Sequence, residues 1–451
     1  MPSSSAWASA GGRNSAVISA AWRGYGTPSA SISTRKMNKV VVIGGGAAGM
    51  MAAVAAAQAG ARVILLERNE KLGKKLYITG KGRCNVTNAV PPEDFQKQVP
   101  HNPRFLFSAL SALSPADLMA LLTSWGCPVM VERGERVFPQ SEKASDVTRA
   151  FERQMENLGV DVRLNQRVRS ILTADEEGSV SLQAVLTENG ERIPADAVIL
   201  CTGGKSYAST GSTGDGHALL SRLGHRLLPT LPALVPLACA EPWVSALQGL
   251  SLKNVRLTLT RGKKILFTDL GEMLFTHFGI SGPLVLSASS YMAGEDLRDL
   301  ELTLDLKPGL TQAQLEDRLL RDIGAAGKKQ LQTLLCGLYP IRLAETVPAL
   351  CGLDGRKPAC EISREERLAL VRITKALPLP VTGTRPLGEA IITRGGLDVR
   401  EVNPATMESK RIPGLYIAGE LLDVDALTGG FNLHIAFSTG YVAGRSAAGA
   451  N

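Results

Sequence analysis

The sequence predicts an α/β protein in which one nucleotide-binding domain is interrupted by a β-rich insert and a helical insert. The first observation is a β-branched strand followed by a glycine-rich turn and an alanine-rich helix near the start of the chain. The second is another buried strand, ending in Gly-Glu, near the end of the chain. The third is the pattern between them, which changes to short alternating segments and then to helical spacing. Two distant segments are therefore expected to build one domain.

The segment from Val40 to Glu67 has the order strand, glycine turn, helix, strand and terminal acid. Its turn has the spacing G-x-G-x-x-G, formed by Gly44, Gly46 and Gly49. Gly44 permits the tight turn, Gly46 lets the backbone approach a pyrophosphate, and Gly49 lets the helix pack closely on the strand. Glu67 can accept hydrogen bonds from a ribose 2′-hydroxyl and would repel a 2′-phosphate. We therefore expect a Rossmann-like domain that binds FAD or NAD in preference to NADP.

A second cofactor contact is expected near the C-terminus. Residues 415–418 form a buried strand that ends in Gly419-Glu420, and Asp423 follows. An alanine- and glycine-rich helix is expected from about 434 to 448. Asp423 suits the ribityl hydroxyls of a flavin, and the positive end of the helix dipole suits its pyrimidine end. These features favour FAD as the cofactor.

The change of pattern along the chain gives the expected domain boundaries. Residues 1–36 are rich in Ser, Ala and Gly, so they cannot form a hydrophobic core. They contain basic residues but no acid, a composition that targeting peptides share. We expect a disordered tail, or a true start at Met37, in preference to a targeting peptide. The expected domains are the first part of the FAD-binding domain at 37–228, the β-rich insert at 229–308 and 377–396, the helical insert at 309–376, and the second part of the FAD-binding domain at 397–451.

Composition limits the class of protein. The chain has 451 residues, which suits two or three domains, and no apolar run approaches the length of a membrane span. Its seven cysteines are scattered, odd in number and never in C-x-x-C spacing, so we expect neither a disulfide framework nor a metal site. A cytoplasmic protein in a reducing compartment is the expectation. Of the net charge of +8, residues 1–36 contribute half, so the remainder is mildly basic and compatible with an RNA partner.

The chain resembles one bacterial flavoprotein family from Met37 to Arg445. The family has the same motifs in the same order, namely Gly44 to Gly49, Thr79 to Asn85, Thr202 to Gly204, Phe275 to Pro283, Thr382 to Pro386, and Thr428 to Asn432. It includes the bile-acid-operon flavoprotein, proteins named aminoacetone oxidases, and the flavin-dependent dihydrouridine synthase of 23S ribosomal RNA. The resemblance implies FAD contacts at Gly44, Gly46, Gly49, Glu67, Lys81, Arg83, Asn85, Gly203, Gly419, Glu420, Asp423, Gly430, Phe431 and Asn432.

Two residues are candidates for proton transfer. Cys84 shares its loop with Lys81 and Arg83, whose charge is expected to lower the pKa of the thiol. It is either a general acid beside the flavin or a small buried residue of a loop that serves only FAD. His277, in a Thr-His-Phe-Gly segment, could donate a proton to substrate or brace its loop.

Basic residues are candidates for substrate binding. Arg385 and Arg394 could grip a phosphate or carboxylate, or form structural ion pairs. The run Lys71, Lys74 and Lys75 is typical of a solvated face, although it could also face RNA.

These features predict an FAD-dependent oxidoreductase. The favoured substrate, from the resemblance, is uridine in 23S ribosomal RNA, reduced to dihydrouridine by hydride from the reduced flavin. The alternatives are a small-molecule flavoenzyme, either a reductase of an unsaturated ketone such as a bile-acid derivative or an amine oxidase such as aminoacetone oxidase, and an RNA-binding factor without turnover. No second G-x-G-x-x-G motif with its strand and acid is visible, so NAD(P)H, the expected electron donor, would approach through the substrate cleft. The sequence leaves the oligomeric state open.

Overall fold

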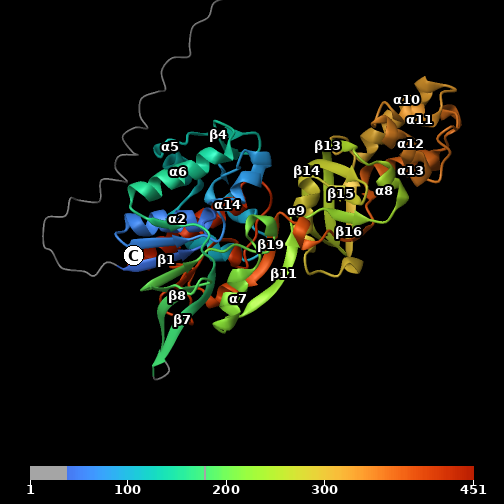
Figure 1. Ribbon diagram of the computed structural model, residues 1–451. Helices are drawn as coiled ribbons and strands as arrows, with labels where there is room; N and C mark the ends of the chain where they lie inside the picture. Colours follow the sequence, from blue (N-terminus) through green and yellow to red (C-terminus); the bar gives the residue numbers. More distant parts are fainter. Residues whose placement is uncertain (1–37, 177–178, 451) are drawn as a thin grey trace, which may run out of the picture. The chain divides into compact units, whose positions relative to one another are not determined.

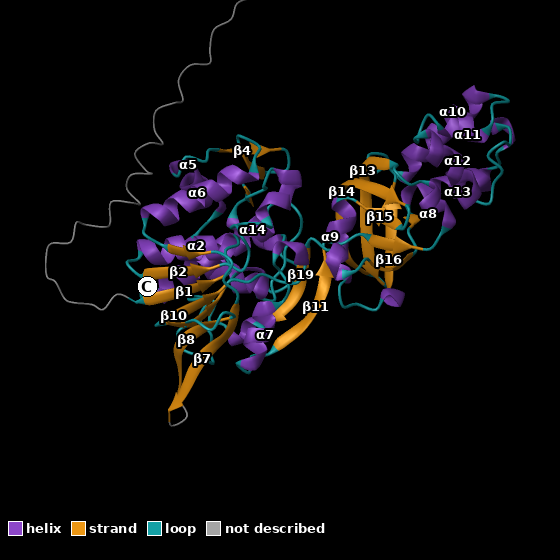
Figure 2. Cartoon of the chain, in the orientation of Figure 1, coloured by secondary structure: helices purple, strands orange, loops and turns teal. Residues whose placement is uncertain are grey.

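The computed structural model describes residues 38–176 and 179–450 (Figure 1). The expectations for residues 1–36 therefore lie outside the described residues. In the described part the strands form sheets of five, two, seven, three and three strands, and helices lie between them in sequence (Figure 2). The predicted α/β class with a Rossmann-like domain is confirmed.

A parallel five-stranded sheet forms the centre of the nucleotide-binding domain, in the order β20-β10-β1-β2-β6. Its strands are β1 (Lys39–Ile43), β2 (Arg62–Leu66), β6 (Asp161–Arg163), β10 (Ala197–Leu200) and β20 (Leu415–Ile417). β1 and β10 are apolar at nearly every position because both faces of the sheet are covered. The C-terminal strand β20 pairs with β10, so the last part of the chain completes a sheet that the first part begins.

Two helices of this domain pack closely against each other, α2 (Ala47–Gln58) and α14 (Phe431–Ala447). A Cβ atom at Gly440 would lie 2.3 Å from the carbonyl oxygen of Ala48, and one at Gly444 would lie 2.3 Å from that of Ala52. Only glycine allows this approach. The sequence shows only that both helices are rich in small residues. The structure shows that these residues allow the two helices to pack closely against each other.

Helix α14 begins three residues before the expected position of about 434. The turn before it ends at Gly430, which has a left-handed backbone with φ of 100°, and the chain is helical immediately afterwards. The polar residue Asn432 and the buried ring of Phe431 therefore lie in the first turn of the helix instead of in a loop.

The remaining elements of this part of the chain surround the parallel sheet. One antiparallel sheet contains β3 (Thr87–Asn88), β4 (Val129–Glu132) and β5 (Arg136–Pro139), and another contains β7 (Val168–Glu176), β8 (Ser179–Thr187) and β9 (Arg192–Pro194). The helices are α3 (Pro92–Lys97), α4 (Phe107–Ala112), α5 (Pro115–Ser124), α6 (Ala144–Asn157) and α7 (Asp215–Arg222).

The segment Pro103–Ser124 has the length and hydropathy of a membrane span, with a mean hydropathy of 1.7, contrary to the expectation that no apolar run is long enough. The structure divides it, because Leu113 leaves the helical conformation and Ser114 starts a new helix. Ser114 and Asp117 form a reciprocal capping box at that start. The segment is thus two short helices with a capped break between them.

The middle of the chain forms a second hydrophobic core. Its seven-stranded sheet has the order β17-β16-β13-β14-β15-β12-β18. The strands are β12 (Leu237–Cys239), β13 (Ser251–Arg261), β14 (Lys264–Thr276), β15 (Gly279–Ser281), β16 (Leu300–Asp305), β17 (Leu377–Pro378) and β18 (Val381–Thr384), and a separate ribbon pairs β11 (Leu227–Ala233) with β19 (Ile392–Leu397). The helices are α8 (Pro242–Ala246), α9 (Pro283–Met292), α10 (Gln312–Ala326), α11 (Leu331–Leu335), α12 (Ile341–Leu350) and α13 (Arg364–Lys375). The order of strands followed by helices is the one predicted; the exact domain boundaries stay a prediction.

Candidate functional site

A long cavity starts at the turn between β1 and α2 and contains about 1320 Å³ of space, its open mouth included. Its walls come from segments far apart in the chain, namely 43–48, 66–79, 166–168, 201–219, 391–392, 419–424 and 432–436. The carboxyl ends of the parallel strands form its floor, as expected for a Rossmann-like domain.

The three glycines of the turn have different surroundings. Gly44 has φ of 103°, and a Cβ there would lie 2.6 Å from the carbonyl oxygen of Cys201. A Cβ at Gly49 would lie 1.8 Å from the carbonyl oxygen of Gly44. By contrast, a Cβ at Gly46 would meet no protein atom within 4 Å. Gly44 and Gly49 thus allow close packing, while the space beside Gly46 belongs to the cavity.

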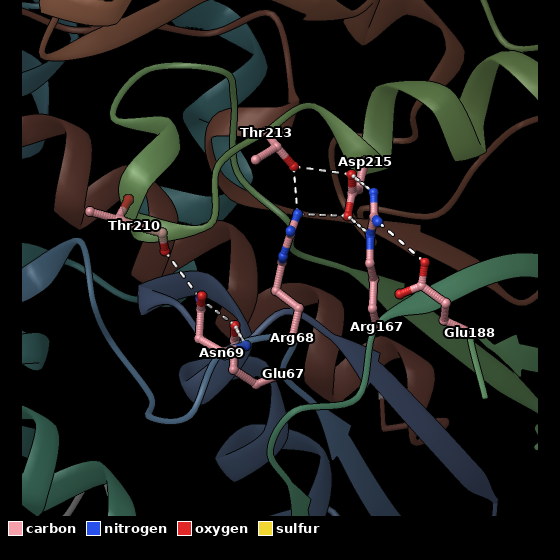
Figure 3. A network of polar contacts seen from close by, with 8 residues as sticks. All are labelled: Glu67, Arg68, Asn69, Arg167, Glu188, Thr210, Thr213 and Asp215. Atoms are coloured by element: carbon pink, nitrogen blue, oxygen red, sulfur yellow. Dashed lines mark hydrogen bonds and ion pairs between the residues drawn. The ribbon is translucent and has the colours of Figure 1, made fainter.

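Glu67 lies at the end of β2, in the cavity wall, and is only 7% exposed. Its carboxylate accepts hydrogen bonds from the Gly45 backbone N–H at 2.6 Å and from the backbone N–H and Nδ2 of Asn69 at 2.8 and 2.7 Å. Asn69 Nδ2 also donates to the carbonyl oxygen of Thr210 (Figure 3). These bonds fix the carboxylate at the place where the sequence predicts the adenosine ribose.

A polar network beside Glu67 contributes Arg68, Arg167 and Asp215 to the cavity wall, and the sequence interpretation missed it (Figure 3). Asp215 Oδ2 accepts from Arg68 Nη1 at 3.0 Å and from Arg167 Nε at 2.8 Å. The hydrogen bond from Arg167 is the largest cause that lowers the pKa of Asp215. Asp215 also accepts from Thr213 Oγ1. This network ties the 210–215 loop to the end of β2. Two features of the sequence could have indicated this network. They are the basic residue Arg68 directly after Glu67 and the glycine-rich stretch at 211–216.

Lys75 lies in the cavity wall, so the expectation of a solvated face is wrong for this residue. Its Nζ lies 2.5 Å from Glu420 Oε2 and 2.8 Å from Ser206 Oγ. Glu420 Oε1 in turn accepts from Ser206 Oγ and from the Thr393 backbone N–H. The cavity thus contains an ion pair that joins the loop after β2 to the segment after β20. The physical reason for the correction is the carboxylate that β20 presents, which no local pattern around Lys75 reveals.

Four other predicted cofactor residues line the cavity, and a fifth does not. Gly203, Gly419, Glu420 and Asn432 line the cavity. Asp423 does not line it, because its carboxylate accepts from Asn102 Nδ2 at 3.0 Å and from the Gly395 backbone N–H at 3.0 Å. Burial is the main cause that raises the pKa of Asp423. Contact between Asp423 and the ribityl chain stays a prediction.

Phe431 and Gly430, two further predicted cofactor residues, do not line the cavity. The ring of Phe431 is buried and meets that of Phe95 edge to face, with centroids 4.9 Å apart. A Cβ at Gly430 would lie 2.3 Å from the carbonyl oxygen of Thr87. His434, one turn further, is fully buried between Thr87 Oγ1 and the carbonyl oxygen of Leu113, and burial lowers its pKa to about 4.

In the loop from Thr79 to Asn85, Thr79 lines the cavity. Arg83 instead forms ion pairs with Glu132 and Glu142, and its guanidinium lies 4.1 Å from the centre of the Phe138 ring. Lys81 is exposed on a left-handed backbone with φ of 59°. Asn85 Oδ1 is buried and has no hydrogen-bond partner among the described residues. The roles of Lys81, Arg83 and Asn85 in FAD binding stay predictions.

Cys84 is fully buried, and burial raises the pKa of its thiol to about 12. The expected lowering by Lys81 and Arg83 is therefore wrong. Arg83 directs its guanidinium at carboxylates, and desolvation of the thiolate outweighs any distant positive charge. Of the two roles left open for Cys84, this environment favours the small buried residue.

This environment makes a labelling prediction. In the folded protein at pH 8, iodoacetamide is expected to modify the exposed Cys336 and Cys360 at least roughly 100-fold faster than Cys84, because the thiolate is the nucleophile. Peptide mass spectrometry over time measures the rates, and urea-unfolded protein provides the control in which all sites react. Labelling of Cys84 at a rate comparable to Cys336 would contradict its burial.

The candidate substrate residues lie in two different places. His277 is exposed, and its ring meets Phe278 edge on at 5.0 Å. Arg385 pairs with Glu389 at 2.7 Å, and its guanidinium lies 4.6 Å from the centre of the Phe278 ring. His277, Phe278 and Arg385 thus form one group. Arg394, on β19, donates instead to the carbonyl oxygen of Ala293 after α9 and does not join them.

The cavity fits FAD on its own features. Gly46 leaves open space beside the first turn of α2, whose free N–H groups attract a pyrophosphate. Thr202 Oγ1 lies in the cavity wall, is buried, and has no hydrogen-bond partner among the described residues, so it is available to a phosphate or hydroxyl. Glu67 stands ready for a ribose, and apolar atoms of Ile391, Val424 and Leu433 offer a surface for a ring system.

The chain is similar to known proteins along nearly its whole length. A family profile described as HI0933-like protein Rossmann domain matches residues 38–446. The 3-dehydro-bile acid delta(4,6)-reductase of Clostridium scindens is 33% identical over 86% of this chain and 93% of its own length. The ribosomal RNA dihydrouridine synthases of Escherichia coli and Haemophilus influenzae are 30% and 29% identical, each over 85% of this chain and 91% of their own length.

Proposed function

This chain belongs to the HI0933-like family of Rossmann-domain proteins and is an FAD-dependent oxidoreductase, and from this premise we propose that it reduces a carbon–carbon double bond conjugated to a carbonyl group. The observation that carries the proposal is the chemistry that the relatives' names share. A bile-acid delta(4,6)-reductase and a dihydrouridine synthase are named for additions of hydrogen to such a bond. The first names a steroid ketone and the second a pyrimidine.

The residues of the cavity have separable roles in this reaction. Glu67 would bind the adenosine ribose, and the turn at Gly46 with Thr202 would hold the pyrophosphate. Bound and reduced, FAD supplies the hydride. The ion pair of Lys75 and Glu420 would hold the wall beside the ring system in place and exclude water from it. NAD(P)H is the proposed electron donor.

Within this reaction we propose uridine of 23S ribosomal RNA as the substrate. The group formed by His277, Phe278 and Arg385 supports RNA, because an aromatic ring beside a guanidinium is a common platform for a stacked base. The guanidinium could also contact a phosphate of the same strand. The target base must be unpaired or flipped, since stacked bases are inaccessible to a cavity.

A small-molecule substrate is the second candidate, and the bile-acid reductase among the relatives favours it. In that case an unsaturated ketone would take the place of the base against the same ring system. An amine oxidase is the third, and it would pass electrons to oxygen instead of to a double bond.

The test is the dihydrouridine content of 23S ribosomal RNA from cells with and without the gene. We expect one position to lose its signal in the deletion strain and to regain it with the wild-type gene. If every position is unchanged, the RNA substrate is rejected. The purified flavoprotein is then tested in two forms. After reduction with NADH or NADPH it is offered unsaturated ketones, and in its oxidised form it is offered amines in the presence of oxygen. Reoxidation by a ketone, with no oxygen consumption in the presence of amines, retains the proposed reaction.

A further inference from the structure

The segment 71–92 joins the cavity to the surface of the protein. It contains five basic residues and no acid. Four of its residues line the cavity, namely Lys74, Lys75, Leu76 and Thr79. Three residues interspersed with them have exposed side chains, namely Lys71, Ile78 and Lys81. The same short stretch of chain therefore forms part of the cavity wall and part of the surface beside that wall.

Two of the five basic side chains in this segment have no acidic partner. The other three form ion pairs, which are Lys74 with Glu70, Lys75 with Glu420, and Arg83 with both Glu132 and Glu142. The charge of Lys71 also acts on Glu70, but that carboxylate is already bound by Lys74 at 2.8 Å. Neither Lys71 nor Lys81 forms an ion pair with a carboxylate of the described residues. Two positive charges beside the cavity wall are thus left for an anionic partner.

An aromatic ring lies next to one of these charges. Nζ of Lys71 lies 4.5 Å from the centre of the Tyr77 ring, and the neighbouring side chain of Ile78 is 45% exposed. A cation–π contact at an exposed site is weak, so the ammonium group can leave the ring for a phosphate. The ring is then free to stack against a base, and Ile78 extends the apolar surface beside it.

The backbone at Lys81 separates this residue from the cavity. Gly80, Lys81 and Gly82 all have a left-handed backbone, with φ of 57°, 59° and 88°. Thr79, just before this turn, lines the cavity, whereas Lys81 is exposed and does not line it. A left-handed conformation is uncommon for lysine, and the two glycines allow the turn that contains it. The charge of Lys81 is therefore presented at the surface, although the family resemblance implies a contact with FAD.

Single-stranded RNA is the partner that this surface fits. Proteins bind unpaired RNA through basic side chains on the phosphates and aromatic side chains on the bases, and both are present here. An anionic membrane fits less well, because residues 71–81 expose one large apolar side chain, Ile78, and insertion needs a broader apolar face. A small substrate inside the cavity would contact neither Lys71 nor Lys81.

We propose that residues 71–81 hold the RNA strand next to the target uridine. Lys71 and Lys81 contact phosphates of this strand, and Tyr77 with Ile78 packs against a base that flanks the target. This inference rests on the proposed function and identifies a surface that favours RNA over a small ketone. Because the same segment forms part of the cavity wall, a strand bound here has its neighbouring unpaired base at the cavity.

The experiment uses the full-length holoprotein and a labelled fragment of 23S ribosomal RNA that contains the uridine located by the deletion strain. Fluorescence anisotropy measures affinity over a series of salt concentrations. Lys71→Gln/Lys81→Gln is expected to lower the slope of log affinity against log salt by about 1.4, since each phosphate contact on a single strand accounts for about 0.7. The same slope predicts a loss of affinity of roughly 25-fold at 0.1 M salt. The KM for reduction of the fragment should rise by a similar factor.

Tyr77→Leu tests the aromatic contact separately. It keeps an apolar side chain but removes the stacking face, so affinity should fall by roughly 5-fold or more while the salt slope stays that of the wild type. Loss of slope without a change in stacking, and the reverse, distinguish the two kinds of contact.

The matched control is Lys328→Gln/Lys329→Gln, which removes the same charge from two exposed lysines that follow α10. Its affinity and salt slope should equal those of the wild type. The basic residues of the first 36 positions are present in every variant, so their contribution cancels in the comparison. FAD absorbance is recorded for each variant, and sedimentation with vesicles of phosphatidylserine and phosphatidylcholine is measured in parallel.

The possible failures have different meanings. If the wild type forms dihydrouridine and Lys71→Gln/Lys81→Gln binds and reduces the fragment equally well, the surface is rejected and the proposed function stands. An equal loss in Lys328→Gln/Lys329→Gln would assign the effect to overall charge and reject the surface. Loss of vesicle binding alone would assign it to a membrane, and loss of FAD from Lys81→Gln would assign that lysine to the cofactor. If the wild type forms no dihydrouridine, the RNA substrate is rejected and the surface with it.

Discussion

Gly46→Ala is expected to weaken FAD binding by roughly 100-fold or more and to leave the protein folded. The backbone at Gly46 is extended, with φ of −82°, so alanine fits it without strain. The added methyl group meets no protein atom within 4 Å and projects into the space where the pyrophosphate is expected to approach α2. FAD fluorescence titration of the apoprotein measures the affinity, and urea unfolding of the same apoprotein measures its stability.

Gly49→Ala is the matched variant, in which the added methyl group clashes with the protein itself instead of entering the cavity. Its Cβ would lie 1.8 Å from the carbonyl oxygen of Gly44, so the helix must shift. We expect the apoprotein to lose about 2–4 kcal/mol of unfolding free energy, and FAD binding to fall as a consequence. Wild-type affinity in Gly46→Ala would mean that the pyrophosphate does not pass this turn.

Acidification from pH 7.5 to 4.5 is expected to lower the free energy of unfolding by several kcal/mol. Burial lowers the pKa of both His217 and His434 to about 4 from an ordinary 6.5. Because the unfolded chain takes up these protons first, the stabilisation is fully present above about pH 6.5 and is lost as pH falls towards 4. Each ring accounts for about 2–3 kcal/mol at pH 4.5. Asp423, with its raised pKa, opposes this loss.

The measurement is urea unfolding at a series of pH values for the wild type, His217→Gln, His434→Gln and the double variant. Glutamine cannot take up the proton, so each single change should remove about half of the pH-dependent loss. His434→Gln should also be less stable at pH 7.5, since it loses imidazole bonds to Thr87 and Leu113. An unchanged loss in the double variant would assign the acid sensitivity to other groups.

Local patterns predicted the fold well. The strand, turn and helix from β1 to α2 are encoded by neighbouring residues, and their bounds agree with the structure within a few residues. The return of the chain to the same sheet was also predictable, since β20 has the apolar composition of a strand buried on both faces. The predicted start of α14 was too late. Phe431 and Asn432 directly follow a glycine turn, and without knowledge of the conformation of that turn they resemble part of a loop.

The site was less predictable, because its polar partners are distant in sequence. Lys75 meets Glu420, which is more than three hundred residues away. No spacing rule encodes such a pair. Cys84 shows a different reason: its charged neighbour Arg83 is adjacent in sequence, but the direction of that side chain and the burial of the thiol decide the pKa.

The pairing of β20 with β10 has a consequence for biosynthesis. β10 ends at Leu200 and its partner begins at Leu415, so about 10–40 s separate their synthesis at ~5–20 residues per second. During that interval the nascent chain presents an open apolar strand edge and the face of α2 that α14 later covers. The cavity lacks its walls at 419–424 and 432–436 until β20 and α14 have been synthesised, so a product truncated before residue 415 cannot form the complete FAD site and is a natural substrate for chaperones and proteases.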